Sequence, residues 1–195
     1  MKAYLMILLL GLLSATAPSP VIAAAIPLDV DIPTLSAGAL SGHGQNLALR
    51  VDDTRTSPVI GKTLEGMDIV SGQDLDAGID NSLSDVLRGN GFLPQMNDAG
   101  ASVRVHVRLV SLHYSAESHY FLTTKAHLDC KIAVEVIRPD MGTSEHSYEA
   151  HGDYTSAWRP TSGRIAKQVN ATLHDALQAM LEDRRLAAWL NSAPQ

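Results

Sequence analysis

Residues 120–136 of the chain read YFLTTKAHLDCKIAVEV, and this stretch decides the fold. Apolar side chains occupy every second position over most of its length, which is the period of a β-strand with one buried face. The positions between them carry polar and charged side chains, namely Lys125, His127, Asp129, Lys131 and Glu135. The pattern therefore predicts a long strand that presents one face to the core and the other to solvent.

Two neighbouring segments repeat this alternation. Residues 102–107 alternate in the same way, and the phase breaks at residues 109–110, as it does at a β-bulge. Residues 147–157 form a third alternating segment. Turn-forming residues at 115–118 and 138–142 separate the three segments. The sequence thus predicts three consecutive antiparallel strands.

Helical periodicity occurs on both sides of these strands. Apolar side chains fall on one helical face within residues 74–88 and again within residues 162–182. Residues 46–53 alternate, which predicts a strand ahead of the first helix. The order strand, helix, three strands, helix predicts an α+β fold of two layers, in which an antiparallel sheet packs against two helices.

The N-terminal region has the layout of an export signal. Lys2 precedes the apolar run Leu5–Leu13, and the small residues Ala23-Ala24-Ala25 follow. The run is about half of the roughly 20 apolar residues that a membrane-spanning helix needs. We therefore predict a cleaved signal peptide over residues 1–25 and a soluble, exported protein in the periplasm. Because no cysteine lies near the cleavage region, no stable lipid anchor is expected.

The remaining chain divides into two parts. Residues 26–45 are rich in Pro, Gly, Ser and Ala, which predicts a flexible leader whose short extended pieces could pair on a sheet edge. Residues 46–195 are expected to form a single α+β domain. Within it, residues 56–72 contain one proline and three glycines and are interpreted as a long loop.

Composition excludes several classes of partner. The net charge is −6 and the chain has no long basic run, which argues against nucleic acid and against docking on anionic lipid. Cys130 is the only cysteine, so no intrachain disulfide can form. We expect its thiol to be buried and inert, because free cysteines are among the most buried residues.

Three histidines provide a candidate metal site. His106, His127 and His151 each lie on the polar face of a predicted strand, and Asp129 lies near them in sequence. Adjacent strands are about 4.8 Å apart, so these side chains could converge on a metal ion if the register allowed it. The chain has neither a nucleophile elbow nor a phosphate-binding glycine loop, and no cofactor or catalytic residue is predicted.

Two other groups of residues are candidates for binding. Asp52, Asp53 and Arg55 lie at a strand end beside the predicted long loop, and ligand sites favour such loops. Trp158 and Arg159 come just before the last helix. An exposed tryptophan beside an arginine is typical of an anchor for a protein partner.

The chain resembles the YajG family of bacterial envelope lipoproteins over about residues 46–192. The resemblance rests on fold-bearing stretches at 51–56, 79–92, 105–109, 124–126 and 148–152. It implies a small envelope domain that acts as an accessory or adaptor component, with no assigned reaction. The family typically carries a lipid-bearing cysteine, and this chain has Ala23-Ala24-Ala25 instead.

Together these features predict a non-catalytic periplasmic accessory or adaptor protein that binds an envelope protein or another component of the cell envelope. The alternative is a metal-binding protein or metal-dependent enzyme that uses the three histidines. A third interpretation is a small-ligand binder with an apolar groove between helix and sheet. The sequence leaves a homo-oligomer open.

Overall fold

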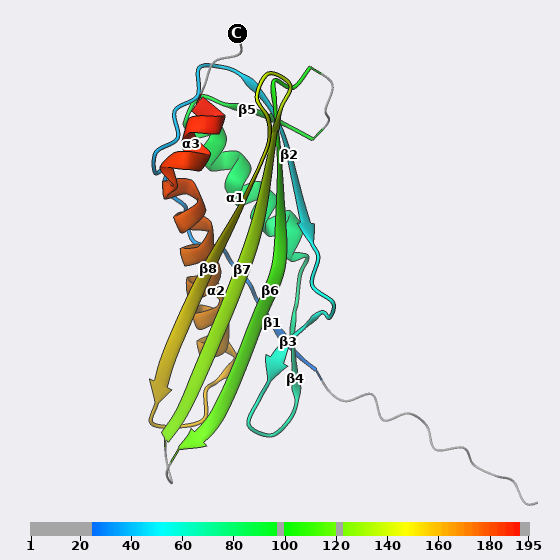
Figure 1. The fold of residues 1–195 in the computed structure, drawn as a ribbon. Helices are drawn as coiled ribbons and strands as arrows, with labels where there is room; N and C mark the ends of the chain where they lie inside the picture. Colours follow the sequence, from blue (N-terminus) through cyan, green and yellow to red (C-terminus); the bar gives the residue numbers. More distant parts are fainter. Residues whose placement is uncertain (1–24, 97–99, 120–122, 192–195) are drawn as a thin grey trace, which may run out of the picture.

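The computed structural model describes residues 25–96, 100–119 and 123–191. Within these residues the chain forms one eight-stranded sheet and three helices (Figure 1). In chain order the elements are β1 (Ile26–Leu28), β2 (Asn46–Asp53), β3 (Val59–Lys62), β4 (Asp68–Ser71), α1 (Leu75–Gly89), β5 (Leu93–Gln95), β6 (Val103–His119), β7 (Thr123–Arg138), β8 (Gly142–Ser156), α2 (Ser162–Glu182) and α3 (Arg184–Asn191).

The three predicted antiparallel strands are confirmed as β6, β7 and β8, but the turn predicted at residues 115–118 is wrong, because these residues continue β6 in its pairing with β7. β6 pairs with β7 from Arg104–Ile137 to His119–Thr123, and β7 pairs with β8 along its whole length. The register shifts between Leu109 and Ser111, where the broken alternation predicts a bulge. Val110 is the extra residue, and its side chain is exposed.

The prediction of a purely antiparallel sheet is wrong, because the sheet is mixed. β2 runs parallel to β6, with Leu47 opposite Val103 and Asp53 opposite Leu109. The pairs β2–β5, β1–β4 and β3–β6 are parallel as well. A parallel pair needs a long crossover connection, and the segment that contains α1 supplies it between β2 and β6. Alternation within a strand carries no information about the direction of its neighbour, so the α+β class is confirmed while the strand directions are not.

Residues 56–72 are not a featureless loop, since they contain the antiparallel pair β3–β4. Each of these strands has only four residues, too few to show a clear alternation. β3 also meets β6 at Gly61, opposite Tyr114. A Cβ atom on Gly61 would lie 2.0 Å from the Tyr114 carbonyl oxygen, so this close approach of two backbones requires glycine.

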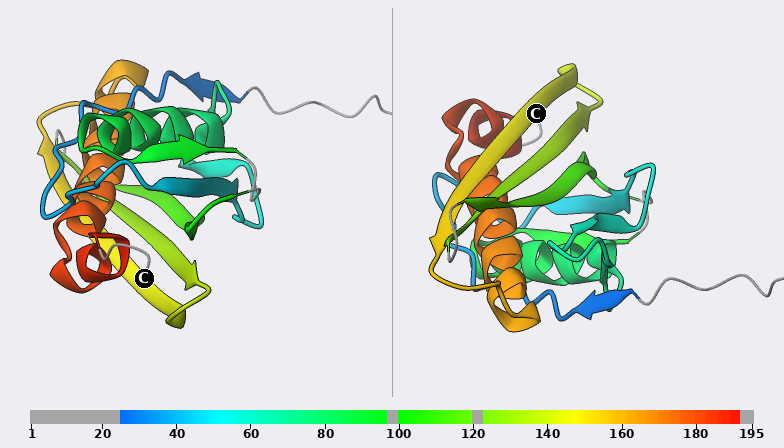
Figure 2. Two further views of the ribbon diagram at one scale, coloured as in Figure 1. Left: turned by 90° about the horizontal axis from the view of Figure 1, so that it is seen from above. Right: turned by 90° about the horizontal axis from the view of Figure 1, so that it is seen from below.

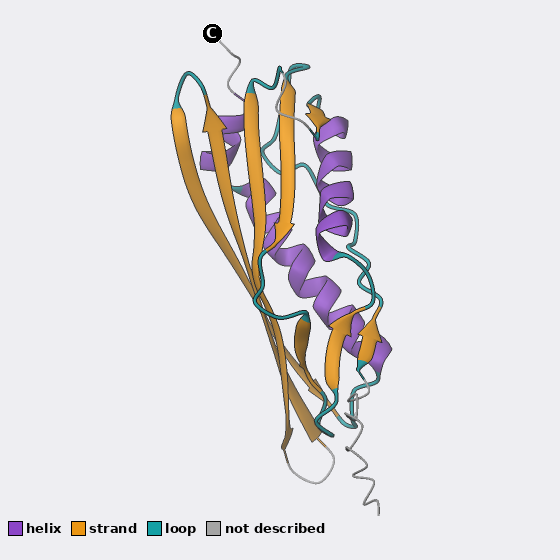
Figure 3. Ribbon diagram, turned by 90° about the vertical axis from the view of Figure 1, so that its right-hand side faces the viewer, coloured by secondary structure: helices purple, strands orange, loops and turns teal. Residues whose placement is uncertain are grey.

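Both long helices cover the same face of the curled sheet, as Figures 2 and 3 show. The inner side chains of β7 are buried in strict alternation, and α2 packs across β7 and β8. Cys130 lies on this inner face with 1% of its surface exposed, and burial raises the pKa of its thiol to about 12. The predicted burial of Cys130 is therefore confirmed.

The third helix was not predicted, and two polar contacts hold it in place. Arg138 is 2% exposed at the end of β7, where it forms an ion pair with Asp140 (2.7 Å) and donates to the carbonyl oxygen of Trp189 (3.1 Å). At the junction of α2 and α3, Asp183 accepts a hydrogen bond from the Tyr148 hydroxyl (2.9 Å). Burial and this carboxylate both raise the pKa of Tyr148.

Residues 26–45 lie against the domain over most of their length. The pairing of β1 with β4 agrees with the expected edge pairing. Beyond β1, the Ser36 amide donates to Gln178 (3.0 Å) and the Ser41 amide to Asn191 (2.9 Å), so the segment follows α2 toward α3. Four of its apolar side chains are buried in the core, namely Leu28, Val30, Leu35 and Leu40. The flexibility of this segment stays a prediction.

Truncation of Leu40 tests how firmly this segment is docked. Leu40 is 6% exposed and lies in the core, so Leu40→Ala should lower the free energy of unfolding in urea by about 2–4 kcal/mol. Leu93→Ala is the control, since Leu93 is 52% exposed, and its effect should stay below about 1 kcal/mol. Equal effects of the two substitutions would mean that residues 26–45 contribute little to the folded state.

Candidate functional site

The register of the sheet separates the three histidines proposed as metal ligands. His106 lies opposite Glu135 on β7, whereas His127 lies on β7 eight residues before Glu135. At about 3.3 Å per residue this separation is roughly 26 Å. His106 therefore cannot share a metal ion with His127 and His151.

The remaining two histidines bind carboxylates of the adjacent strand. His151 Nδ1 contacts Asp129 at 2.7 Å, and His127 Nδ1 contacts Asp153 on the next row of the ladder. All four side chains lie on the exposed outer face of the sheet. In the part of the chain that the structure describes, no three His, Cys, Asp or Glu side chains are arranged to hold a metal ion. The geometry thus forms cross-strand ion pairs instead of the predicted convergent site.

Asp52 and Asp53 are adjacent in sequence but point to opposite faces of β2. Asp52 lies on the outer face, where it contacts His106 Nε2 (2.7 Å) and Arg50 Nε (2.8 Å). Partial burial opposes ionisation of Asp52, but the hydrogen bonds from His106 and Arg50 outweigh it and lower its pKa. The two carboxylates therefore do not act as a pair.

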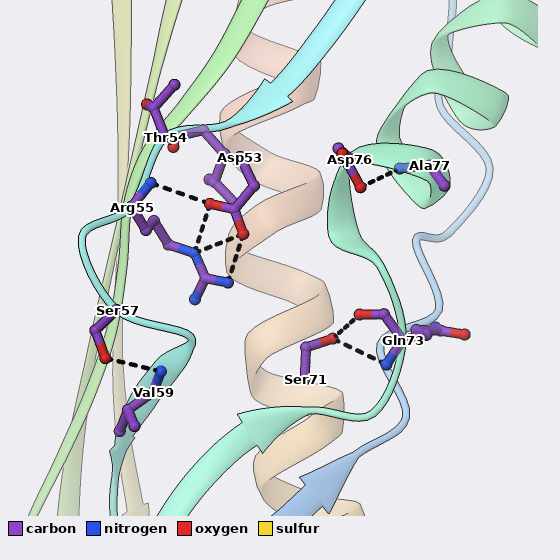
Figure 4. Close-up of polar contacts among 10 residues, drawn as sticks. Asp53, Thr54, Arg55, Ser57, Val59, Ser71, Gln73, Asp76 and Ala77 are labelled. Atoms are coloured by element: carbon purple, nitrogen blue, oxygen red, sulfur yellow. Dashed lines mark hydrogen bonds and ion pairs between the residues drawn. The ribbon is translucent and has the colours of Figure 1, made fainter.

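Asp53 and Arg55 form a tight local ion pair at the end of β2 (Figure 4). Asp53 accepts from Arg55 Nε (2.9 Å) and Nη2 (2.7 Å), and also from the Arg55 amide (3.1 Å). The Arg55 side chain is only 7% exposed. Thr54 ties this corner to the bulge in β6, because its amide and hydroxyl both donate to the Leu109 carbonyl oxygen (3.0 and 3.1 Å). Asp53 and Arg55 therefore stabilise the bend that follows β2, which is a structural role.

The connection from β4 to α1, also drawn in Figure 4, makes local contacts. The Ser71 hydroxyl donates to the Gln73 carbonyl oxygen (2.5 Å) and accepts from the Gln73 amide (3.3 Å). Asp76 accepts from the Ala77 amide (2.9 Å) in the first turn of α1, where a carboxylate is favourable. These contacts shape the turn before α1. None of them involves Asp53 or Arg55.

Trp158 and Arg159 lie at the end of the domain that also carries the β3–β4 turn. The Trp158 side chain is 71% exposed, the largest exposed aromatic surface among the described residues. Arg159 forms an ion pair with Glu65 in the β3–β4 turn. A hydrogen bond from the Glu65 backbone amide and one from Thr63 lower the pKa of Glu65, and Arg159 adds to this. The candidate binding residues Trp158 and Arg159 are thus joined to the predicted loop at residues 56–72, although Arg159 and Glu65 are 94 positions apart in sequence.

A groove opens beside this end of the domain. It has a volume of about 420 Å³ and lies between β3 and the part of β6 that follows the bulge. Its lining combines small, polar and apolar side chains: Ser57, Val59, Gly61, Lys62, Thr63, His113, Tyr114, Ser115 and Ala116. One wall of the groove comes from residues 56–72, which the sequence predicts to be a loop. The other wall comes from β6, and no pattern in the sequence indicated it.

The apolar core that α2 and α3 cover offers no comparable space, although a groove of about 400 Å³ lies between α1 and β2. The cavity lined by Leu49, Leu83 and Leu181, among others, has a volume of about 20 Å³. That is room for about one water molecule. This part of the described interior is therefore packed, and the proposed ligand groove between helix and sheet does not occur there.

The sequence matches the model of a known family of lipoproteins. The model of the Lipoprotein_16 family, described as "Uncharacterized lipoprotein", matches residues 33–191. The chain therefore belongs to this family. Membership supports an exported envelope protein, and no helix among the described residues is long and apolar enough to cross a membrane.

Several solved structures are similar to the chain at low sequence identity. A Helicobacter pylori protein described as a neuraminyllactose-binding hemagglutinin homolog matches with a TM-score of 0.51 and 9% identity, over 84% of this chain and 95% of that chain. A minor lipoprotein from Acinetobacter baumannii has a TM-score of 0.46 and 11% identity, covering 74% and 94%. A PelC dodecamer from Paraburkholderia phytofirmans has a TM-score of 0.37 and 11% identity, covering 73% and 92%. No curated protein matches the chain in sequence.

The Asp53–Arg55 pair should contribute more to stability than an exposed ion pair does. Asp53→Asn leaves a buried guanidinium without its counter-charge, so we expect the free energy of unfolding to fall by about 2–3 kcal/mol. Asp68→Asn removes a carboxylate from the exposed Lys62–Asp68 pair and should cost less than about 1 kcal/mol. Urea denaturation of both variants at neutral pH measures the difference. Equal decreases in the free energy of unfolding would contradict a structural role for the Asp53–Arg55 pair.

Asp52 should make stability depend on pH in the acid range. Its pKa in the folded protein lies below the ordinary value of 3.8, so its contacts stabilise the protein above that value. This contribution is lost as pH falls through the folded-state pKa. Thermal unfolding measured between pH 7 and pH 2.5 gives the free energy of unfolding at each pH. Over this range it should fall by about 0.5–1 kcal/mol less in Asp52→Asn than in the wild type. Identical acid profiles would exclude the effect.

Proposed function

We propose that this protein is a non-catalytic accessory or adaptor component of the bacterial envelope, exported to the periplasm and close to the YajG type of lipoprotein. Membership of the lipoprotein family supports the envelope assignment. We further propose that the chain is released from its signal peptide and has no stable lipid anchor of its own. Its partner would be a protein or another component of the cell envelope, and neither nucleic acid nor a cofactor is involved.

One observation supports the location of the binding surface. The ion pair between Arg159 and Glu65 fixes the segment before α2 against the β3–β4 turn and holds the exposed Trp158 beside it. Large aromatic side chains and arginines dominate the binding energy of protein interfaces. The Trp158 indole, with 71% of its surface in solvent, is accessible to such a partner.

The adjacent groove gives a partner a second means of attachment. Among the described residues, β3 meets β6 only at Gly61 and Tyr114, so the β6 backbone beyond this contact has an open edge. An extended segment of a partner could pair with that edge while Trp158 anchors it, which is the mode of β-strand addition. This mechanism combines backbone hydrogen bonds with one aromatic anchor and requires no catalytic group.

Site-specific crosslinking in the native envelope tests this surface. A photoreactive residue at position 158 should yield one discrete crosslinked species, and the same residue at position 93 should not, although Leu93 is also exposed. Adding Arg159→Ala should reduce the yield at position 158 at least threefold, because the segment that carries the photoreactive side chain loses its contact with Glu65. Identical products at both positions, or a yield that Arg159→Ala leaves unchanged, would refute this binding surface.

A further inference from the structure

The outermost strand β8 is an unprotected edge of the sheet. Within the described residues its backbone pairs with β7 alone, over fifteen residues without a register shift (Figure 1). Soluble proteins usually protect such edges with proline, lysine, a bulge or an inward-pointing charge. β8 contains no proline or lysine, and its one inward-pointing histidine, His146, lies near Asp183 (3.4 Å). A long regular edge of this kind is a template for another strand.

From this edge we infer that two copies of the chain associate through antiparallel pairing of their β8 strands about a two-fold axis at Ala150. Two identical side chains face each other where such an axis crosses the strand. Ala150 is small enough for this position, whereas an axis at Tyr148 would bring two bulky rings together. The inference goes beyond the proposed function, since it concerns a different surface and a partner of known sequence.

The charges on the outer face favour this register. An axis at Ala150 places Glu149 of one copy opposite His151 of the other, twice in the dimer. An axis at Glu149 would instead oppose two carboxylates directly, and an axis at His151 would oppose Glu149 to Asp153. Opposite charges across neighbouring strands are stabilising and like charges are destabilising, so the pairing about Ala150 is preferred to an axis at Glu149 or at His151.

The same register continues a pattern that each chain already has. Within one chain Lys131 binds Glu149 (2.7 Å), and Asp129 binds His151 (2.7 Å). Pairing about Ala150 aligns these two rows across the axis. The resulting row runs Lys131, Glu149, then the second copy's His151 and Asp129. Both cross-strand contacts remain intact, and the Glu149 carboxylate gains an imidazole on its open side, which carries a positive charge when it is protonated.

Charge reversal at the two facing positions tests the inference on the exported, purified protein. Sedimentation equilibrium should show that the wild type dimerises, and that Glu149→Lys and His151→Glu each raise the dimer dissociation constant at least tenfold. An equimolar mixture of the two variants should restore association to within about threefold of the wild type. In that mixed dimer the introduced lysine faces the introduced glutamate, and the native Glu149 of one chain faces the native His151 of the other. In both pairs that face each other across the interface, a carboxylate then lies opposite a lysine or a histidine.

Glu145→Lys is the matched control. It makes the same charge change on the same strand, but the inferred register places position 145 opposite Thr155, so the dissociation constant should change less than twofold. A wild-type protein that stays monomeric at several hundred micromolar would overturn the inference. So would a control that weakens association as much as Glu149→Lys does, or a mixture that fails to recover. Because the mixture uses the same two variant chains, recovery also excludes misfolding as the cause of their separate defects.

Discussion

The antiparallel pairing of β6 with β7 is the constraint on which the other parts of the structure depend. β2 and β3 attach to the free side of β6, and β8 attaches to the free side of β7. The inner side chains of both strands are buried in the core, and α2 packs across β7 and β8. A slip of one residue in this pairing would turn every inner side chain to solvent, so the apolar alternation itself protects the register.

The bulge at Val110 divides the sheet into two halves. Before it, β6 pairs with β2, and after it, β6 meets β3 at Tyr114. Thr54 binds the Leu109 carbonyl oxygen at this point, so β2 ends where the bulge begins. The chain then turns through the Asp53–Arg55 corner and returns as the β3–β4 hairpin. The groove and the Trp158 surface therefore owe their position to one extra residue in β6.

Local patterns predicted the parts of the fold and of the site whose signal lies within one segment. Alternation identified β6, β7 and β8, and helical stripes identified α1 and α2. These patterns could not show that β2 runs parallel to β6, because strand direction depends on how the crossover packs, and β3 and β4 are too short to display a period. The Asp53–Arg55 contact spans two residues and could be anticipated at a strand end. The contact between Arg159 and Glu65 depends on how two distant segments meet, which no local pattern encodes.

The outer face of the sheet explains why histidines gather there without forming a site. Similar strand patterns put His106 and His127 on one face, but the register set them far apart. On β7 and β8 the acidic and basic side chains face each other across the strands, in the pairs His127–Asp153, Asp129–His151 and Lys131–Glu149. Each of these charges is satisfied by a neighbour, so the face itself offers a ligand few unpaired groups. Among the described residues, the backbone edges of β6 and β8 and the indole of Trp158 are open to a partner. A domain of this kind has its recognition capacity at its edges and ends, because helices occupy one face and paired charges the other.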